Sequence, residues 1–328
     1  MKLNAEQLEK ITQGAERVTE EKEGLRFHRF TVAQEEYYLA VSPENYYIRA
    51  CASAGVSLAF CTDSETLKIS AVYGRGSSRE TGFTDIEVNG EIVFRLGSAE
   101  NALKDFGGAY PLGKGEKTVR VYFPQLLSLT LKEFSLDDGA KIEPLPAERN
   151  MLIFGDSITQ GYDALYPTHS YAARLTSLLK AHARNKGIGG EMFAPRLALL
   201  KDEDFHPEII TVAYGTNDFS CLKSDVAAKN IFEFYDNLSG TYPHAKIFAI
   251  SPVWRGDKDR EKTCEKPFEW LCGQIRAAAE RQKNAVYVCG AELVPHDPAC
   301  YSPDLLHPND TGFATYAERL YAAIEENL

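Results

Sequence analysis

The sequence predicts two domains of different fold class: an all-β sandwich of the jelly-roll kind over residues 1–145, and an α/β domain with a parallel sheet over 146–328. Three observations predict this. Apolar and polar residues alternate through most of the first half. In the second half, short apolar runs alternate with segments of helical periodicity. Between the two, residues 142–149 contain Pro144 and Pro146, which predicts a short, stiff linker.

The first domain is expected to begin with a short helix over residues 4–13, with Asn4 as its N-cap. Alternation then predicts strands over 67–73, 86–88, 92–96, 119–123 and 127–131. The pair Asn89-Gly90 stands between two of these runs and predicts a tight hairpin, because both turn residues must tolerate positive φ. We expect no long helix between Leu25 and Leu145.

The sequence pattern predicts alternating strands and helices in the second domain. Strands are expected over 151–154, 209–214, 247–250 and 286–288, and helices over 170–182, 224–238, 266–283 and 309–326, with Ser224 as a helix cap. This order indicates a parallel sheet with helices on both faces. In such sheets the functional residues gather beyond the carboxyl ends of the strands.

Charge and composition exclude several partners. Asp and Glu outnumber Lys and Arg by 47 to 36, so a nucleic-acid partner is not expected. No apolar run approaches the roughly 18 residues of a membrane span, and the first residues lack the apolar core of a signal peptide. The seven cysteines include no CxxC pair. We therefore expect reduced thiols, a cytoplasmic location and no membrane partner.

Two candidate blocks come first in the second domain, one of them directly after the strand expected over 151–154. In Gly155-Asp156-Ser157, the serine lies just past a strand end, where a neighbouring base would make it a nucleophile; the alternative is an ordinary turn serine. The run from Asn185 to Gly190 is rich in glycine, so its backbone N–H groups can approach a ligand oxygen closely.

Two further blocks supply polar side chains. Asn217, within GTND, could direct its amide N–H groups at a developing oxyanion, or could form an Asx-turn. Asp304 precedes His307 by three residues, so its carboxylate can orient the imidazole as a base. The alternative is that Asn309 or Asp310 caps the last helix and His307 is incidental.

The blocks GDSIT, NKGIGG, GTND and DLLHPN, in this order, resemble the GDSL or SGNH hydrolase superfamily over roughly residues 150–328. The resemblance implies a flavodoxin-like domain and a serine esterase. It implies that Ser157 is the nucleophile, with His307 and Asp304 completing a triad. It also implies an oxyanion hole formed by Gly190, Asn217 and the backbone N–H of Ser157. Which of Gly187, Gly189 and Gly190 donates is left open.

The two-domain order is similar to that of the acetyl esterases of carbohydrate esterase family two. This implies a small-molecule or oligosaccharide substrate carrying short acyl, notably acetyl, esters. A lipase or thioesterase using the same residues, and an inactive carbohydrate-binding protein, are the alternatives. No cofactor is implied, and no metal site is expected because HExxH and Cys/His clusters are missing. The oligomeric state is left open.

Some residues are weaker candidates. Asp156, Trp254 and His169 are possible substrate contacts near the site. Trp254 could equally pack in the interior, and helix capping or exposure is the simpler interpretation of His169. His296-Asp297 is a rival acid–base pair, but it lies in a proline-containing turn before the last block.

Overall fold

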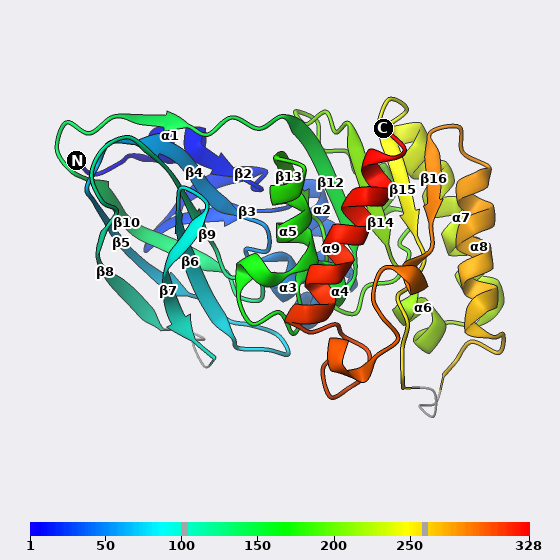
Figure 1. Cartoon of the computed structure of the whole chain (residues 1–328). Helices are drawn as coiled ribbons and strands as arrows, with labels where there is room; N and C mark the ends of the chain where they lie inside the picture. Colours follow the sequence, from blue (N-terminus) through cyan, green and yellow to red (C-terminus); the bar gives the residue numbers. More distant parts are fainter. Residues whose placement is uncertain (100–103, 258–261) are drawn as a thin grey trace. The chain divides into compact units, whose positions relative to one another are not determined.

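The computed structural model describes residues 1–99, 104–257 and 262–328, and the chain divides into two compact units. Unit 1 comprises Met1–Ala147 together with Tyr166–Thr168, and unit 2 comprises Glu148–Leu165 and His169–Leu328 (Figure 1). Unit 1 is a β domain and unit 2 an α/β domain, so the predicted fold classes are confirmed.

Unit 1 is built from two antiparallel sheets. One contains β1 (Thr12–Gln13), β4 (Ser57–Thr62), β9 (Lys117–Tyr122), β6 (Gly82–Val88) and β7 (Glu91–Ser98), with β11 (Ile142–Pro144) beside β4. The other contains β2 (Arg17–Glu21), β3 (Gly24–His28), β10 (Leu129–Leu136), β5 (Thr66–Tyr73) and β8 (Asp105–Pro111). Alternate residues of both sheets, including Phe60, Ile69, Val121 and Phe134, form one apolar core.

Two local predictions in unit 1 are confirmed. Helix α1 (Ala5–Ile11) is capped by Asn4, whose side chain accepts from the Gln7 backbone N–H while the Gln7 side chain accepts in return. Strands β6 and β7 form the expected hairpin, with Asn89 at φ 51° and Gly90 at φ 84°.

No long helix is expected between Leu25 and Leu145, but the sequence did not predict the three short helical segments that the structure places there. Helix α2 (Val32–Val41), η1 (Pro43–Tyr47) and α3 (Ile48–Ala50) stand between β3 and β4. Thr31 caps α2 and forms a reciprocal capping box with Gln34. That Thr-x-x-Gln spacing is a start signal visible in the sequence.

The linker in the structure is shorter than the predicted range of residues 142–149, because both ends of that range belong to strands. Its first residues form β11, which pairs with β4, and Leu145 N–H donates to Ala59 O at 3.0 Å. Pro144 is tolerated there because β11 is a short peripheral strand that does not need every N–H. At the other end, Arg149 already belongs to β12.

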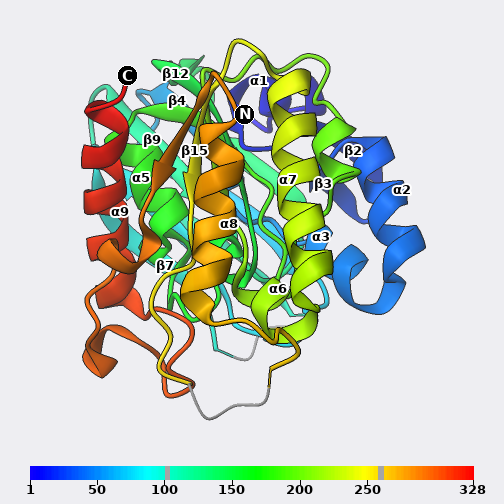
Figure 2. The same cartoon turned by 90° about the vertical axis from the view of Figure 1, so that its right-hand side faces the viewer.

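Unit 2 has a five-stranded parallel sheet in the order β13 (Ala181–Asn185), β12 (Arg149–Gly155), β14 (Ile209–Ala213), β15 (Lys246–Ile250) and β16 (Ala285–Val288). Helices α5 (Tyr171–Leu178) and α9 (Asp310–Glu325) pack together on one face, and α7 (Ser224–Thr241) and α8 (Phe268–Glu280) on the other (Figures 1 and 2).

The alternation of β12 explains this layering. Met151 and Ile153 belong to the core under α5 and α9. Phe154 points to the opposite face, where its ring meets Phe234 of α7 at a centroid distance of 6.1 Å. A strand with apolar residues on both sides must be covered on both sides.

Several helix boundaries differ from the predictions: α7 continues to Thr241 rather than ending at 238, and α8 covers Phe268–Glu280 rather than 266–283. Helix α5 ends at Leu178 rather than at 182, because Lys180 adopts φ 48° and turns the chain into β13. Ser224 is the first residue of α7, not its cap, and its N–H donates to Glu265. The cap of α9 is Asn309, one of the two residues proposed.

Within the described residues, every helix is too short or too polar to span a lipid bilayer.

Candidate active site

The first block forms a sharp turn from strand to helix. Strand β12 ends at Gly155, and Ser157 begins the short helix α4 (Ser157–Gln160). A side chain at Gly155 would collide with Thr159 and with Ala213 O, so glycine is required there. Asp156 is 1% exposed, and its Oδ1 accepts from the Ile158 N–H. We therefore assign Asp156 to holding the turn, in place of the substrate contact considered from the sequence.

Ser157, His307 and Asp304 form a continuous hydrogen-bonded chain. Ser157 Oγ lies 2.8 Å from His307 Nε2, and His307 Nδ1 lies 2.6 Å from Asp304 Oδ2. An ionised carboxylate only accepts, so Nδ1 carries the proton and Nε2 is left to accept from the serine. This is the arrangement in which an imidazole can act as a base toward a hydroxyl.

A tight turn brings Asp304 back onto His307. Leu305 adopts φ 52°, and Asp304 Oδ1 accepts from the backbone N–H groups of Leu306 and His307, each at 3.0 Å. Partial burial would raise the pKa of Asp304, but the His307 imidazole and these two N–H groups outweigh it and hold that pKa well below its ordinary value. Asp304 therefore stays ionised and keeps the imidazole oriented.

Two residues that the sequence did not single out also surround His307. The Tyr162 ring stacks on the imidazole, with centroids 5.8 Å apart and planes inclined by 24°. Asp163 Oδ2 lies 3.9 Å from His307 Nδ1. Asp163, Asp304 and His307 are close enough to hold a cation. Both ring nitrogens are already within hydrogen-bond distance of a protein oxygen, however, so the geometry favours a proton-transfer group.

The glycine-rich loop follows β13 and lies against the first block. The N–H of Gly187 donates to Asn185 Oδ1 at 2.8 Å, and the N–H of Gly189 donates to Gln160 Oε1 at 2.8 Å. Gly190 adopts φ 81°, a conformation that favours glycine. Gly190 as the oxyanion donor stays a prediction from the sequence.

Asn217 lies in the first turn of α6 (Thr216–Cys221), directly beyond β14. Its Nδ2 donates to Glu191 O at 2.9 Å, which uses one amide hydrogen and fixes the plane of the amide. The second hydrogen remains to meet an oxyanion. Next to it, Asp218 Oδ1 accepts from the Phe193 N–H at 3.1 Å, a second hydrogen bond between the same two segments. The sequence did not identify Glu191.

Two buried carboxyl groups lie beneath these turns. Burial raises the pKa of Asp156 to about 6 and that of Asp218 to about 7, with hydrogen bonds from backbone N–H groups acting in the opposite direction. The charge on Asp156 adds to the rise at Asp218. Neither group reaches solvent, which favours a structural role for both.

The remaining candidates have other partners. His169 Nδ1 lies 2.8 Å from Asp310 Oδ2 at the start of α9, which agrees with a role in holding that helix terminus. His296 lies against Trp254, with ring centroids 5.8 Å apart, and its Nε2 is 2.9 Å from Ala291 O. The carboxylate of Asp297 caps the short helix η5 (Pro298–Cys300) by accepting from the Ala299 N–H. His296 and Asp297 therefore do not form an acid–base pair.

Trp254 lines a cavity of about 810 Å³ together with Arg255, Phe268 and His296. Among the described residues that line this cavity, none belongs to the Ser157–His307–Asp304 chain. The Trp254 ring also meets Tyr301 edge-on at 5.0 Å and packs on the core of unit 2. A contact between Trp254 and substrate stays a prediction.

Residues 153–315 match the model of the GDSL-like lipase/acylhydrolase family. No curated protein sequence matches the chain.

Among solved structures, the salicylyl-acyltransferase SsfX3 from a tetracycline biosynthetic pathway has a TM-score of 0.77 at 22% identity, covering 97% of this chain and 95% of that one. A family two carbohydrate esterase from Cellvibrio japonicus has a TM-score of 0.70 at 17% identity, covering 99% and 97%. A family two carbohydrate esterase from Clostridium thermocellum, in complex with cellohexaose, has a TM-score of 0.67 at 18% identity, covering 84% and 93%.

These likenesses establish a shared fold along most of the chain, and the family match covers the segment that holds all four blocks. Residues 153–315 belong to the GDSL-like lipase/acylhydrolase family, and the protein is a carboxylic ester hydrolase.

Proposed function

We propose that this protein is a serine esterase that removes short acyl groups, above all acetyl groups, from O-acylated carbohydrates. The observation that carries the proposal is the chain of hydrogen bonds from Ser157 Oγ through the His307 imidazole to the Asp304 carboxylate. Structural likeness to two enzymes described as family two carbohydrate esterases supports the choice of substrate.

In the proposed mechanism, Ser157 Oγ attacks the ester carbonyl carbon while its proton passes to His307 Nε2. The oxyanion of the tetrahedral intermediate accepts hydrogen bonds from the Gly190 N–H, the Asn217 amide and the Ser157 N–H. His307 then returns the proton to the departing alcohol, which leaves an acyl-serine. Water, deprotonated by the same imidazole, attacks the acyl-serine and restores the free enzyme.

Acyl-chain length tests the substrate class. We expect kcat/KM to be higher for p-nitrophenyl acetate than for the butyrate or octanoate ester, and an acetylated oligosaccharide to release acetate. The Ser157→Ala variant is the matched control for hydrolysis that does not use the site. Faster cleavage of the octanoate would contradict the acetyl-esterase proposal and favour the lipase or thioesterase alternative.

Acyl transfer is a second candidate, because the neighbour with a TM-score of 0.77 is described as an acyltransferase. Hydrolysis and transfer share the acyl-serine and differ only in whether water or another nucleophile attacks it. A polar alcohol added to the assay distinguishes them. If the product ester forms faster than free acetate, transfer is the main activity; if acetate release dominates, hydrolysis is the main activity.

Asn217→Ala should lower kcat by about 10²–10³-fold and change KM little, because an oxyanion donor acts mainly in the transition state. Steady-state kinetics on p-nitrophenyl acetate measures the changes in kcat and in KM separately. Asn237→Ala is the matched control, since Asn237 donates to Pro195 O from α7. A rise in KM without loss of kcat would show that Asn217 contacts the substrate instead.

Asp304→Asn should lower kcat/KM more than Asp304→Ala does. Asp304 Oδ1 accepts from two backbone N–H groups, so the oxygen of an asparagine would occupy that position and its NH₂ would face His307 Nδ1. The imidazole would then carry its proton on Nε2 and could not accept from Ser157. We expect kcat/KM to fall by about 10³–10⁴-fold for the asparagine variant.

The alanine variant should lose less, because the Asp304 side chain is 38% exposed and water can replace the carboxylate as partner of Nδ1–H. Comparing kcat/KM of the two variants measures this. Equal losses would contradict the tautomer argument and leave only the lost charge as the cause.

A further inference from the structure

Arg255 is a buried cation in the loop that follows β15, and the proposed mechanism does not use it. The residue is 5% exposed. Its Nε and Nη2 donate to the two oxygens of Asp257, each at 2.7 Å, which gives a two-pronged ion pair within the loop. The charge is therefore balanced locally, and the remaining guanidinium nitrogen is directed elsewhere.

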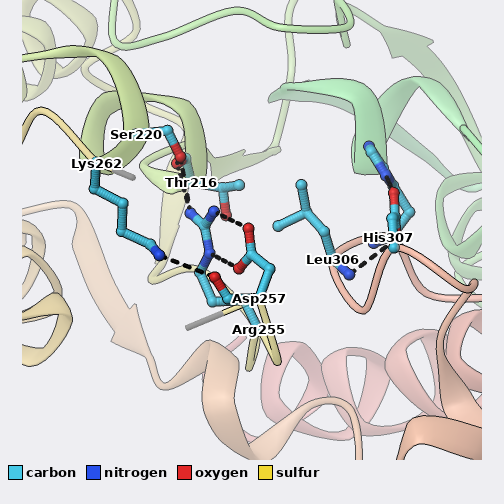
Figure 3. A network of polar contacts seen from close by, with 8 residues as sticks. Thr216, Ser220, Arg255, Asp257, Lys262, Leu306 and His307 are labelled. Carbon is cyan, nitrogen blue, oxygen red and sulfur yellow. Dashed lines mark hydrogen bonds and ion pairs between the residues drawn. The ribbon is translucent and has the colours of Figure 1, made fainter. Parts of the chain in front are cut away.

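That nitrogen binds the helix that carries Asn217. Arg255 Nη1 donates to Thr216 O at 3.0 Å and to Ser220 Oγ at 3.1 Å (Figure 3). Thr216 O belongs to the peptide group that joins Thr216 to Asn217. A planar guanidinium fixed by a carboxylate thus restrains the backbone immediately before the proposed oxyanion donor.

The side chain of Asn217 is restrained from another direction. Its amide donates to Glu191 O, and the Glu191 carboxylate in turn accepts from the Tyr214 hydroxyl at 2.8 Å. One contact fixes the backbone and the other fixes the amide. An oxyanion donor is effective only when it is held at the place where the charge develops.

The Arg255 loop also contacts the segment of Asp304 and His307. The Gly256 N–H donates to Leu305 O at 2.8 Å, and Leu305 is the residue whose positive φ closes the turn between Asp304 and His307. Lys262 Nζ donates to Asp257 O at 3.0 Å and steadies the loop (Figure 3).

We propose that Arg255 is a positioning residue for Asn217: its guanidinium, aligned by Asp257, holds the Thr216–Asn217 peptide so that the Asn217 amide meets the oxyanion. This inference rests on the proposed esterase function and adds a residue that acts through the oxyanion donor. A merely structural Arg255 would affect folding without a specific link to Asn217.

Arg255→Lys tests the geometry while keeping the charge. A lysine ammonium cannot bind both oxygens of Asp257 and the Thr216 carbonyl at once. We therefore expect kcat on p-nitrophenyl acetate to fall about 10- to 100-fold, with KM changing by no more than about twofold. Arg276→Met is the matched control, because Arg276 lines the same cavity but lies over the Tyr287 ring, at 4.5 Å. It should keep wild-type kcat.

A double-mutant cycle with Asn217→Ala gives the decisive readout. If Arg255 acts through Asn217, the lysine substitution should cost less than about threefold in the Asn217→Ala background. The same loss in both backgrounds, a loss confined to KM, or an unchanged kcat in the single variant would overturn the proposal. Guanidinium added to Arg255→Ala should restore part of kcat, because Arg255 lines a cavity of about 810 Å³.

If the Arg255 variants fail to fold, the Ser220→Ala variant tests the positioning role of Arg255 in their place. It removes one acceptor of Arg255 Nη1 and one donor to Thr216 O while leaving the Arg255–Asp257 pair intact. A several-fold loss of kcat that disappears in the Asn217→Ala background supports the proposal, and an unchanged kcat or an equal loss in both backgrounds overturns it.

Labelling of Ser157 by a small fluorophosphonate, followed by mass spectrometry, separates this proposal from the esterase function itself. A wild-type protein inert toward both the ester and the probe overturns the esterase function and the role of Arg255 with it. A reactive wild type with an equally reactive Arg255→Lys variant overturns only the role of Arg255.

Discussion

Ser157→Ala is expected to lower kcat for ester hydrolysis on the order of 10⁴- to 10⁶-fold, because no other hydroxyl in the Ser157–His307–Asp304 chain can form the acyl intermediate. Ser157 Oγ lies 2.8 Å from the nitrogen that would accept its proton. Steady-state assays on p-nitrophenyl acetate measure the loss. Residual activity within tenfold of wild type would show that Ser157 is not the nucleophile.

The fold should survive this substitution. Ser157 is 8% exposed at the first position of α4, and the alanine removes one hydroxyl while leaving the Asp156 cap in place. Thermal unfolding followed by circular dichroism checks this. Ser239→Ala is the matched control, since the Ser239 hydroxyl donates to Asn284 Oδ1 away from the site. The control should retain wild-type kcat.

The location of the candidate site could be predicted because parallel strands place their carboxyl ends at one edge of a sheet. Strands β12 and β14 neighbour each other, so Ser157 and Asn217 follow adjacent strand ends. The spacing of Asp304 and His307 predicted that the carboxylate could reach the imidazole, and the structure shows that contact. Short motifs in chain order were enough to predict this part of the geometry.

The supporting contacts could not be predicted, because they use groups that every residue carries. Glu191 holds Asn217 through its backbone carbonyl, and Arg255 holds the carbonyl of Thr216. No side-chain pattern marks a carbonyl that a distant residue will bind. The contacts of the loop glycines are of the same kind, since only the structure shows that the N–H groups of Gly187 and Gly189 donate to Asn185 Oδ1 and Gln160 Oε1.

Helix α2 was not predicted for a different reason. Residues 32–41 have no marked apolar stripe, and Val32, Leu39 and Val41 are exposed on α2. Without a stripe, periodicity gives no helix signal, and only the capping box of Thr31 and Gln34 marks the start.

His307→Ala should lower kcat on the order of 10⁴-fold or more, nearly as much as loss of the serine, because it removes the nitrogen positioned to accept the Ser157 proton. The wild-type rate should fall toward acid pH, since a protonated imidazole cannot accept that proton. Asp304 is held ionised by its hydrogen bonds, which keep its pKa well below the ordinary value, so this carboxylate does not cause the fall. Assays from pH 5 to 8 measure the profile.

The residual activity of His307→Ala should lack the fall of the wild-type rate toward acid pH, because the base that accepts the Ser157 proton is gone. His296→Ala provides the matched control: His296 stacks on Trp254 rather than meeting Ser157, so its removal should leave both kcat and the acid limb in place. An acid limb that persists unchanged in His307→Ala would contradict His307 as the base. Loss of activity in His296→Ala alone would instead transfer the role of base to the rival histidine.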